Sequence, residues 1–187
     1  MQKKIIMLLI LFISNSANAE GILDNSIFGI ALINQSAERE TTSLGQVSSD
    51  SVTGTGFGLY LDKYVSRKYR FNATISYVSY DAFDVAQLMV SADYLIPIDG
   101  QISLFGGVAA GGALQSYADA SFSDGAVGAV YGGQLGGIMF INDHLMLELG
   151  YRFRPTSGIE TEVLTPANTV ISITDLSETY FSILLMF

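Results

Sequence analysis

Apolar and polar residues alternate along most of the chain after residue 20, with the two-residue period of a β-strand. The clearest example is the segment 144–154. One of its faces carries Leu145, Leu147, Leu149, Tyr151 and Phe153, and the other carries Met146, Glu148, Gly150, Arg152 and Arg154. A helix would scatter the two arginines and the glutamate among the leucines. The segment is therefore predicted to be a strand with one apolar face.

The same alternation predicts eight strands. They cover residues 25–35, 53–63, 69–80, 84–96, 101–115, 127–141, 144–154 and 178–187. The connections at 64–68, 81–82, 97–100 and 141–143 are short, whereas those at 36–52, 117–126 and 156–174 are longer and are predicted to be loops. Short turns opposite longer loops are typical of transmembrane β-barrels.

We therefore predict an all-β fold, a closed eight-stranded antiparallel transmembrane β-barrel whose apolar faces meet lipid. Closure is required because lipid offers no partner to an unpaired strand edge. The composition agrees, since 49% of the residues are hydrophobic and 14% are charged, against about 25% charged residues in a soluble domain. A water-soluble β-sandwich, the alternative fold, would have polar outer faces.

The first 19 residues have the features of a cleavable signal peptide. Lys3 and Lys4 precede nine apolar residues at 5–13, and the small residues Ala17 and Ala19 then form a cleavage site before Glu20. Nine residues are too few for a membrane helix, which needs about 20. We expect residues 1–19 to be the signal peptide and residues 20–187 to be the barrel domain.

The charge balance excludes several kinds of partner. Removal of Lys3 and Lys4 lowers the net charge from −9 to −11, and the chain has no cysteine. An acidic chain without a basic stripe does not bind nucleic acid. Without cysteine there is no disulfide and no thiolate metal site, so we expect no cofactor.

Several charged residues fall on faces predicted to point into the barrel. They are Arg70, Asp93, Glu148, Arg152 and Glu178, together with Asp62 and Arg154 near strand ends. The turn at 81–82 would place Arg70 opposite Asp93, and Arg152 would lie opposite Glu178. Buried charges persist only when they are paired. We expect a salt-bridged network that fills the interior, because an eight-stranded barrel is just wide enough for its side chains; an ion pathway or a proton relay is the alternative.

Aromatic residues on the outward faces predict where the membrane surfaces lie. Tyr69, Tyr77, Tyr94, Tyr151 and Phe187 fall near predicted strand ends and are expected to form the two aromatic girdles. Leu147 is predicted to contact acyl chains near the bilayer centre.

Carboxylates dominate the predicted outer loops. They are Glu38, Glu40, Asp50, Asp81, Asp119, Asp124, Glu160, Glu162 and Asp175. A solvated surface is the simpler interpretation. The alternative is contact with lipopolysaccharide through divalent cations, for which carboxylate oxygens are suitable ligands.

The signal peptide, the hairpin 131–153 and the last segment, Phe181-Ser-Ile-Leu-Leu-Met-Phe187, resemble the small eight-stranded outer-membrane β-barrels of OmpA-like and opacity type. The resemblance covers the whole mature chain. It implies a monomeric protein in the outer membrane of a Gram-negative bacterium, in contact with outer-membrane lipids and lipopolysaccharide. It also implies that Phe181, Ile183, Leu185 and Phe187 are the signal read by the barrel-assembly machinery. We expect no peptidoglycan-binding domain after the last strand.

The expected function is a structural or surface-interaction role without an open pore. A narrow channel for small hydrophobic molecules is one alternative, and a lipid-modifying outer-membrane enzyme is another. No enzymatic activity is expected, because no nucleophile and orienting group can be assembled around the single histidine, His144. The active site of lipid A deacylases looks to be built on a histidine with a serine two residues later. In this chain Met146 occupies the position of that serine.

Overall fold

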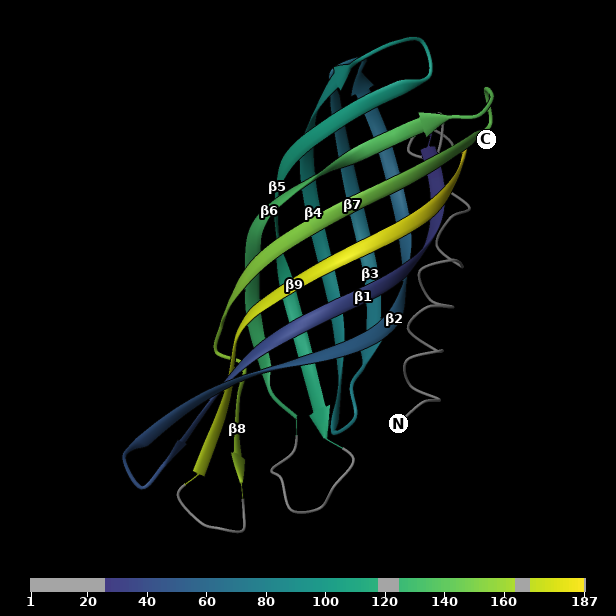
Figure 1. The fold of residues 1–187 in the computed structure, drawn as a ribbon. Helices are drawn as coiled ribbons and strands as arrows, with labels where there is room; N and C mark the ends of the chain where they lie inside the picture. The colour runs from purple at the N-terminus through teal and green to yellow at the C-terminus, as the bar shows by residue number, and fades with distance from the viewer. Residues whose placement is uncertain (1–25, 118–124, 164–168, 187) are drawn as a thin grey trace, which may run out of the picture.

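The computed structural model describes residues 26–117, 125–163 and 169–186, and all its regular elements are strands (Figure 1). They are β1 (Ser26–Ser43), β2 (Gln46–Ser66), β3 (Tyr69–Ser79), β4 (Phe83–Pro97), β5 (Ile102–Tyr117), β6 (Val127–Phe140), β7 (Leu145–Ser157), β8 (Glu160–Val163) and β9 (Thr169–Met186). Within these ranges no helix has the length and apolarity needed to cross a membrane. The predicted cleavage site at Ala17, Ala19 and Glu20 lies outside the described residues, as does Phe187.

The strands form one antiparallel sheet that closes on itself. Each strand from β1 to β7 pairs with the next, β7 pairs with β9, and β9 pairs with β1. The short β8 pairs with β9. The predicted closed eight-stranded barrel is therefore confirmed, and β8 is an addition to it.

The barrel has two different ends. The end at the top of Figure 1, called here the turn end, carries the short connections at 67–68, 98–101 and 141–144 and the end of β9. At the opposite end, called here the hairpin end, β1 and β2 extend beyond the wall of the barrel as a long hairpin.

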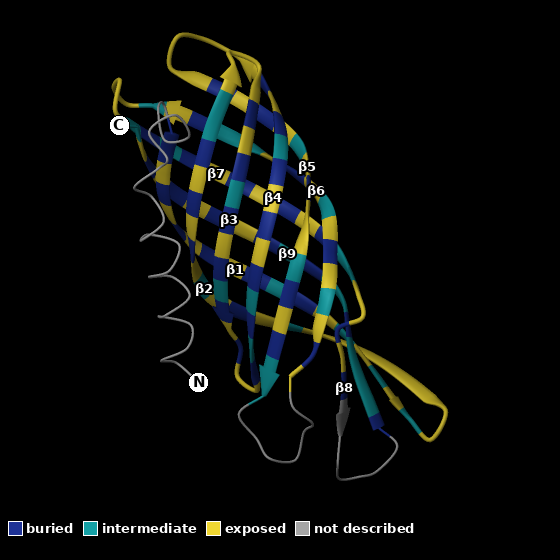
Figure 2. Cartoon of the chain, turned by 180° about the vertical axis from the view of Figure 1, so that it is seen from behind, coloured by how far each residue is buried: buried dark blue, intermediate teal, exposed yellow. Residues whose placement is uncertain are grey.

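Burial alternates along each wall strand, which confirms the predicted facing. Figure 2 shows this as alternating bands of buried and exposed residues. On β7, Leu149, Tyr151 and Phe153 are exposed, whereas Glu148 and Arg152 are buried. The outward faces of the other wall strands are likewise apolar and exposed. An apolar outer surface excludes the β-sandwich and fits a wall in contact with lipid.

The strands are strongly staggered around the barrel. A path that follows the register pairs once around the barrel leads from Ser26 of β1 back to Ser36 of β1, ten residues further along. The path passes through Lys63, Phe71, Ala92, Val108, Gly133, Phe153 and Ser177. Such a stagger tilts the strands by about 35–45° from the barrel axis.

The prediction that Leu147 lies near the bilayer centre is wrong. Leu147 is the third residue of β7, and it pairs with Met139 and Ile183, which lie close to the turn end of β6 and β9. Alternation predicts which face of the wall a residue lies on. It does not predict the position of the residue along the barrel axis, because that position depends on the stagger of the strands. Val108, in the middle of β5 with its side chain 67% exposed, lies at mid-wall instead.

Two predicted loops are strands. Residues 36–52 continue the β1–β2 ladder out to the pair Ser43–Gln46, and the turn between them is Leu44-Gly45, both with positive φ. Residues 156–174 contain β8 and the start of β9. We call β8, residues 169–174 of β9, residues 37–43 of β1 and residues 46–54 of β2 the outer sheet. Its serine- and threonine-rich tip has no apolar period, because both of its faces meet water.

The close approach of neighbouring strands requires glycine at some inward positions. A Cβ atom at Gly132 would lie 2.0 Å from the carbonyl oxygen of Phe153 on the adjacent strand. At Gly100, in the turn after β4, a Cβ atom would meet nothing within 4 Å.

We predict that Gly132→Ala destabilises the barrel by roughly 1–3 kcal/mol, because the backbone of β7 must move to admit a methyl group. Gly100→Ala is the matched control and should have little effect. Urea unfolding of both variants in lipid vesicles measures the difference, and equal stability would contradict the strand spacing.

We also predict that Val108→Arg costs about 2–4 kcal/mol in a bilayer, because the guanidinium would lie near the midplane. Ile141→Arg, in an exposed turn, should cost about 0–1 kcal/mol. Folding free energies in vesicles test this pair. A larger loss at position 141 than at position 108 would show that the membrane meets another part of the wall.

Candidate functional site: the charged interior of the barrel

Apolar side chains close the interior at both ends. Near the turn end, buried residues within a few positions of the strand ends form a layer that contains Ile27, Leu95, Ile138, Met146 and Leu184. Near the hairpin end, a second layer contains Ala37, Tyr80, Phe83, Val85, Val130, Ile159, Ile173 and Leu176. The buried charged residues lie between these two layers.

Three carboxylates surround one guanidinium close to the turn-end layer. Arg70 Nη2 lies 2.8 Å from Asp93 Oδ2, and Arg70 Nη1 lies 3.2 Å from Asp62 Oδ2 and also contacts Glu148. All four side chains are buried. Asp62 and Asp93 come from the neighbours of β3, whereas Glu148 reaches Arg70 across the interior from β7. We call these four residues the Arg70 cluster.

Two guanidiniums surround one carboxylate nearer the hairpin end. Glu178 accepts a hydrogen bond of 2.8 Å from Arg152 Nη1 and one of 2.7 Å from Gln35 Nε2, and it forms an ion pair with Arg154. These side chains are buried as well. We call Glu178, Arg152, Arg154 and Gln35 the Glu178 cluster.

Neutral polar side chains join the two clusters. Gln134 donates from Nε2 to Asp93 Oδ1 at 2.6 Å and accepts at Oε1 from Arg152 Nε at 2.9 Å. The hydroxyl of Tyr180 donates to Glu148 at 2.6 Å, and the centroid of its ring lies 3.9 Å from the Arg152 guanidinium carbon. One network therefore spans the middle of the interior.

The charges within this network nearly cancel. Four carboxylates, of Asp62, Asp93, Glu148 and Glu178, face the three guanidiniums of Arg70, Arg152 and Arg154. Buried ions remain stable only when a partner and further hydrogen bonds replace the water that they have lost. The arrangement is suited to filling the barrel and holding its strands in register.

The structure places all five residues singled out from the sequence, Arg70, Asp93, Glu148, Arg152 and Glu178, inside the barrel and in contact with the network. Arg70 pairs in register with Asp93, and Arg152 pairs with Glu178. Asp62, which alternation already placed inward, joins them, as do Gln35 and Tyr60. Alternation could place them inside, but contacts across the interior depend on the stagger.

The aromatic girdle differs in part from its prediction. Tyr69 and Tyr94 pack edge to face at the turn end, with ring centroids 5.4 Å apart, and Tyr77 packs near Phe57 toward the hairpin end at 6.1 Å. Tyr151 is exposed but lies in the middle of β7, so its assignment to a strand end is wrong. Phe187 lies outside the described residues.

The carboxylates predicted for outer loops lie mainly on strands. Glu38 and Glu40 are exposed on β1, and Glu38 pairs in register with Asp175 of β9. Asp50 forms an ion pair with Arg39 across the β1–β2 hairpin. Asp81 lies in the turn after β3, and Glu160 is exposed on β8. Asp119 and Asp124 are outside the described ranges, and Glu162 lies within β8.

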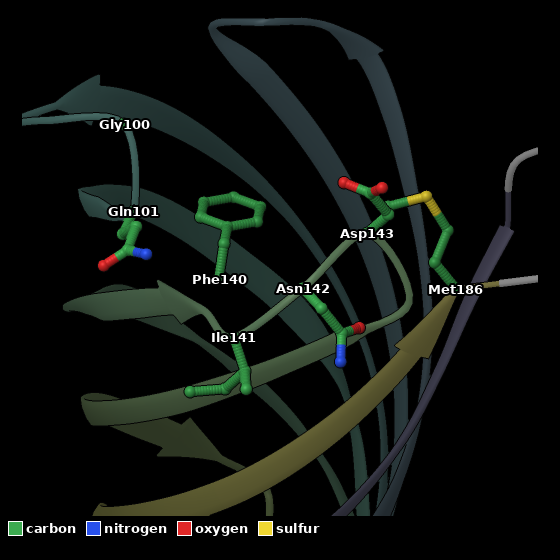
Figure 3. Close-up of a pocket in the computed structure, with 7 residues that line it drawn as sticks. All are labelled: Gly100, Gln101, Phe140, Ile141, Asn142, Asp143 and Met186. Atoms are coloured by element: carbon green, nitrogen blue, oxygen red, sulfur yellow. The ribbon is translucent and has the colours of Figure 1, made fainter.

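A shallow depression opens at the turn end (Figure 3). Gly100 and Gln101 from one turn and residues 141–143 from another surround the side chain of Phe140, and Met186 completes the lining. His144 lies beside it, with Nδ1 3.3 Å from the carbonyl oxygen of Met186. In the part of the chain that the structure describes, no three histidine or carboxylate side chains are placed to hold a metal ion.

We predict that Arg70→Ala destabilises the protein by roughly 3–5 kcal/mol, because it leaves three buried carboxylates without their cation. Lys68→Ala, two residues away in an exposed turn, should change stability by less than about 0.5 kcal/mol. Unfolding in detergent micelles gives both values. In addition, Asp93→Asn should lower the free energy of unfolding less in the Arg70→Ala variant than in the parent protein. Equal losses in the two proteins would contradict the pairing of Arg70 with Asp93.

Comparison with known proteins reveals similarity of fold but not of sequence. No protein-family model matches the chain, and no curated protein matches it. Among solved structures, Neisserial surface protein A aligns with 84% of this chain and 97% of its own, at a TM-score of 0.60 and 15% identity. The outer membrane protein AlkL, solved in lipid bilayers, aligns with 88% of this chain and 90% of its own, at a TM-score of 0.55 and 14% identity.

These matches agree with the closed eight-stranded wall, its apolar outer surface and its short turns at one end. All three are features of barrels that cross the bacterial outer membrane. The chain has the fold of the small eight-stranded outer-membrane β-barrels.

Proposed function

We propose that this protein is a surface-interaction protein, in which a sealed barrel anchors the outer sheet outside the cell. The observation that carries the proposal is the continuation of β1, β2 and β9 beyond the wall of the barrel. A barrel that only crossed the membrane would have no need of this extension. Short turns mark the periplasmic end of such barrels, so the hairpin end faces outward.

The outer sheet is held firmly on the barrel. Ala37 of β1 and Ile173 of β9, at its base, are fully buried in the apolar layer of the hairpin end. Arg39 connects the sheet to the mouth of the barrel, since its guanidinium carbon lies 5.8 Å from the ring centroid of Phe83. A sheet fixed in this way keeps one conformation. Binding to it costs less conformational entropy than binding to a mobile loop would.

A filled interior supports a role without an open pore. Apolar layers lie on both sides of the charged network, and the network itself occupies the middle. A channel for hydrophobic molecules would need an apolar passage, whereas here seven ionic groups cross the centre. We therefore favour surface interaction over transport.

The proposed partners of the barrel wall are outer-membrane lipids, lipopolysaccharide and the barrel-assembly machinery. Phe181, Ile183 and Leu185 lie exposed on the lipid-facing side of β9, the strand that closes the barrel against β1. This position suits both contact with outer-membrane lipids and recognition by the barrel-assembly machinery. Glu38 and Asp175 lie just beyond the wall, where lipopolysaccharide head groups would meet the protein. Closure within a single chain supports a monomer.

Cysteine labelling in intact cells tests the orientation, because the chain has no cysteine of its own. We predict that Leu44→Cys, at the tip of the hairpin, reacts with a membrane-impermeant maleimide. Asp99→Cys, in a turn at the other end, should react only after the outer membrane is permeabilised. The reverse pattern would place the outer sheet in the periplasm.

Planar-bilayer recordings of the purified protein test the sealed barrel separately. We predict no steady conductance steps above those of protein-free bilayers. A stable ohmic channel would contradict the closed interior and restore transport as the leading function.

A further inference from the structure

The outer sheet has an open edge along β2. Residues 46–54 pair with β1 on one side, whereas β3 begins to pair with β2 only at Thr55, opposite Ser79. Among the described residues, none pairs with the second side of this segment. Nine residues of extended backbone are therefore available to another strand.

The geometry of the hairpin identifies the backbone groups at that edge. The two-residue turn Leu44-Gly45 makes Ser43 and Gln46 the first hydrogen-bonded pair. In an antiparallel ladder, alternate residues then direct their N–H and C=O groups to opposite sides. The groups of Val47, Ser49, Ser51 and Thr53 consequently face the open edge.

The usual protection of a free edge is absent from this segment. Proteins block such edges with lysine, proline or a β-bulge. The segment Gln-Val-Ser-Ser-Asp-Ser-Val-Thr-Gly contains neither lysine nor proline, and its register with β1 has no shift. Its one charge, on Asp50, is paired with Arg39. The segment therefore lacks the lysine, proline and β-bulge that often block a free edge.

Charge distinguishes between occupants of the edge. Glu40 and Glu38 lie on β1 directly opposite Ser49 and Ser51, and all four side chains are on the outer face. The small serines leave these carboxylates within reach of a long basic side chain on an added strand. A second copy of this chain would bring the same acidic surface, with a net charge of −11 once Lys3 and Lys4 are removed with the signal peptide, and would be repelled.

We propose that the open edge of β2, residues 46–54, binds an extended segment of another protein that carries lysine or arginine at alternate positions. The segment adds as a strand, exchanging backbone hydrogen bonds with Val47, Ser49, Ser51 and Thr53. Its basic side chains pass over Ser49 and Ser51 to Glu40 and Glu38. This inference rests on the proposed function, since the outer sheet must be displayed outside the cell.

The test uses the full mature protein in lipid nanodiscs and two fluorescent nine-residue peptides, one of alternating threonine and lysine and one of alternating threonine and glutamate. Fluorescence anisotropy should show binding of the lysine peptide and much weaker binding of the glutamate peptide. Ser49→Pro with Ser51→Pro should weaken binding of the lysine peptide roughly tenfold or more, because proline removes two N–H donors from the edge.

The matched control is Ser49→Ala with Ser51→Ala, which keeps both donors and should bind like the parent. Glu38→Gln with Glu40→Gln should weaken binding and reduce its dependence on salt. Unfolding curves that match the parent show that each variant retains the barrel.

Three results would overturn the proposal: no binding of the lysine peptide, undiminished binding by the folded proline variant, or a dimer of the parent chain that the prolines abolish. The first would refute strand addition by basic segments, the second would reduce the interaction to charge alone, and the third would make a second copy the occupant. The labelling of Leu44→Cys tests the display of the sheet independently, so the two proposals can fail separately.

Discussion

Closure of the sheet between β9 and β1 is the constraint on which the rest of this structure depends. Lipid cannot hydrogen-bond to a free strand edge, so the last strand must meet the first. With eight strands and a stagger of ten residues, closure fixes the tilt of the strands and the width of the interior. That width brings neighbouring backbones so close at Gly132 that no side chain fits there.

The charged network follows from the same constraint. A narrow interior excludes bulk water, and any ion inside it needs a partner from the surrounding strands. Arg70 forms ion pairs with carboxylates from β2, β4 and β7, and Glu178 forms ion pairs with two arginines from β7. The contact of Arg70 with Glu148 connects β3 and β7 across the interior, whereas the other ion pairs connect neighbouring strands. They therefore select one register among those that alternation alone would allow.

Alternation along the sequence was sufficient to predict the strands of the wall and the facing of their residues, because lipid on one side and a filled interior on the other impose a strict period of two. It failed at residues 36–52, where most side chains meet water and Ser48, Ser49 and Ser51 carry no apolar signal. It also failed to predict the positions of residues along the barrel axis, as Leu147 and Tyr151 show. Contacts such as that of Arg70 with Glu148 depend on the stagger, which no local pattern encodes.

The unbroken course of β1 from the turn end to the tip of the hairpin gives the molecule a mechanical character. A load applied at Leu44 along the strand direction pulls β1 and β2 together, so it acts in shear on the ladders that join β1 to β9 and β2 to β3. The β1–β9 ladder is continuous apart from the irregularity between Glu38 and Arg39. A load across the strands would open the pairs one after another from the tip, at much lower force. The outer sheet is thus a tether that resists traction along the strands and releases when it is peeled.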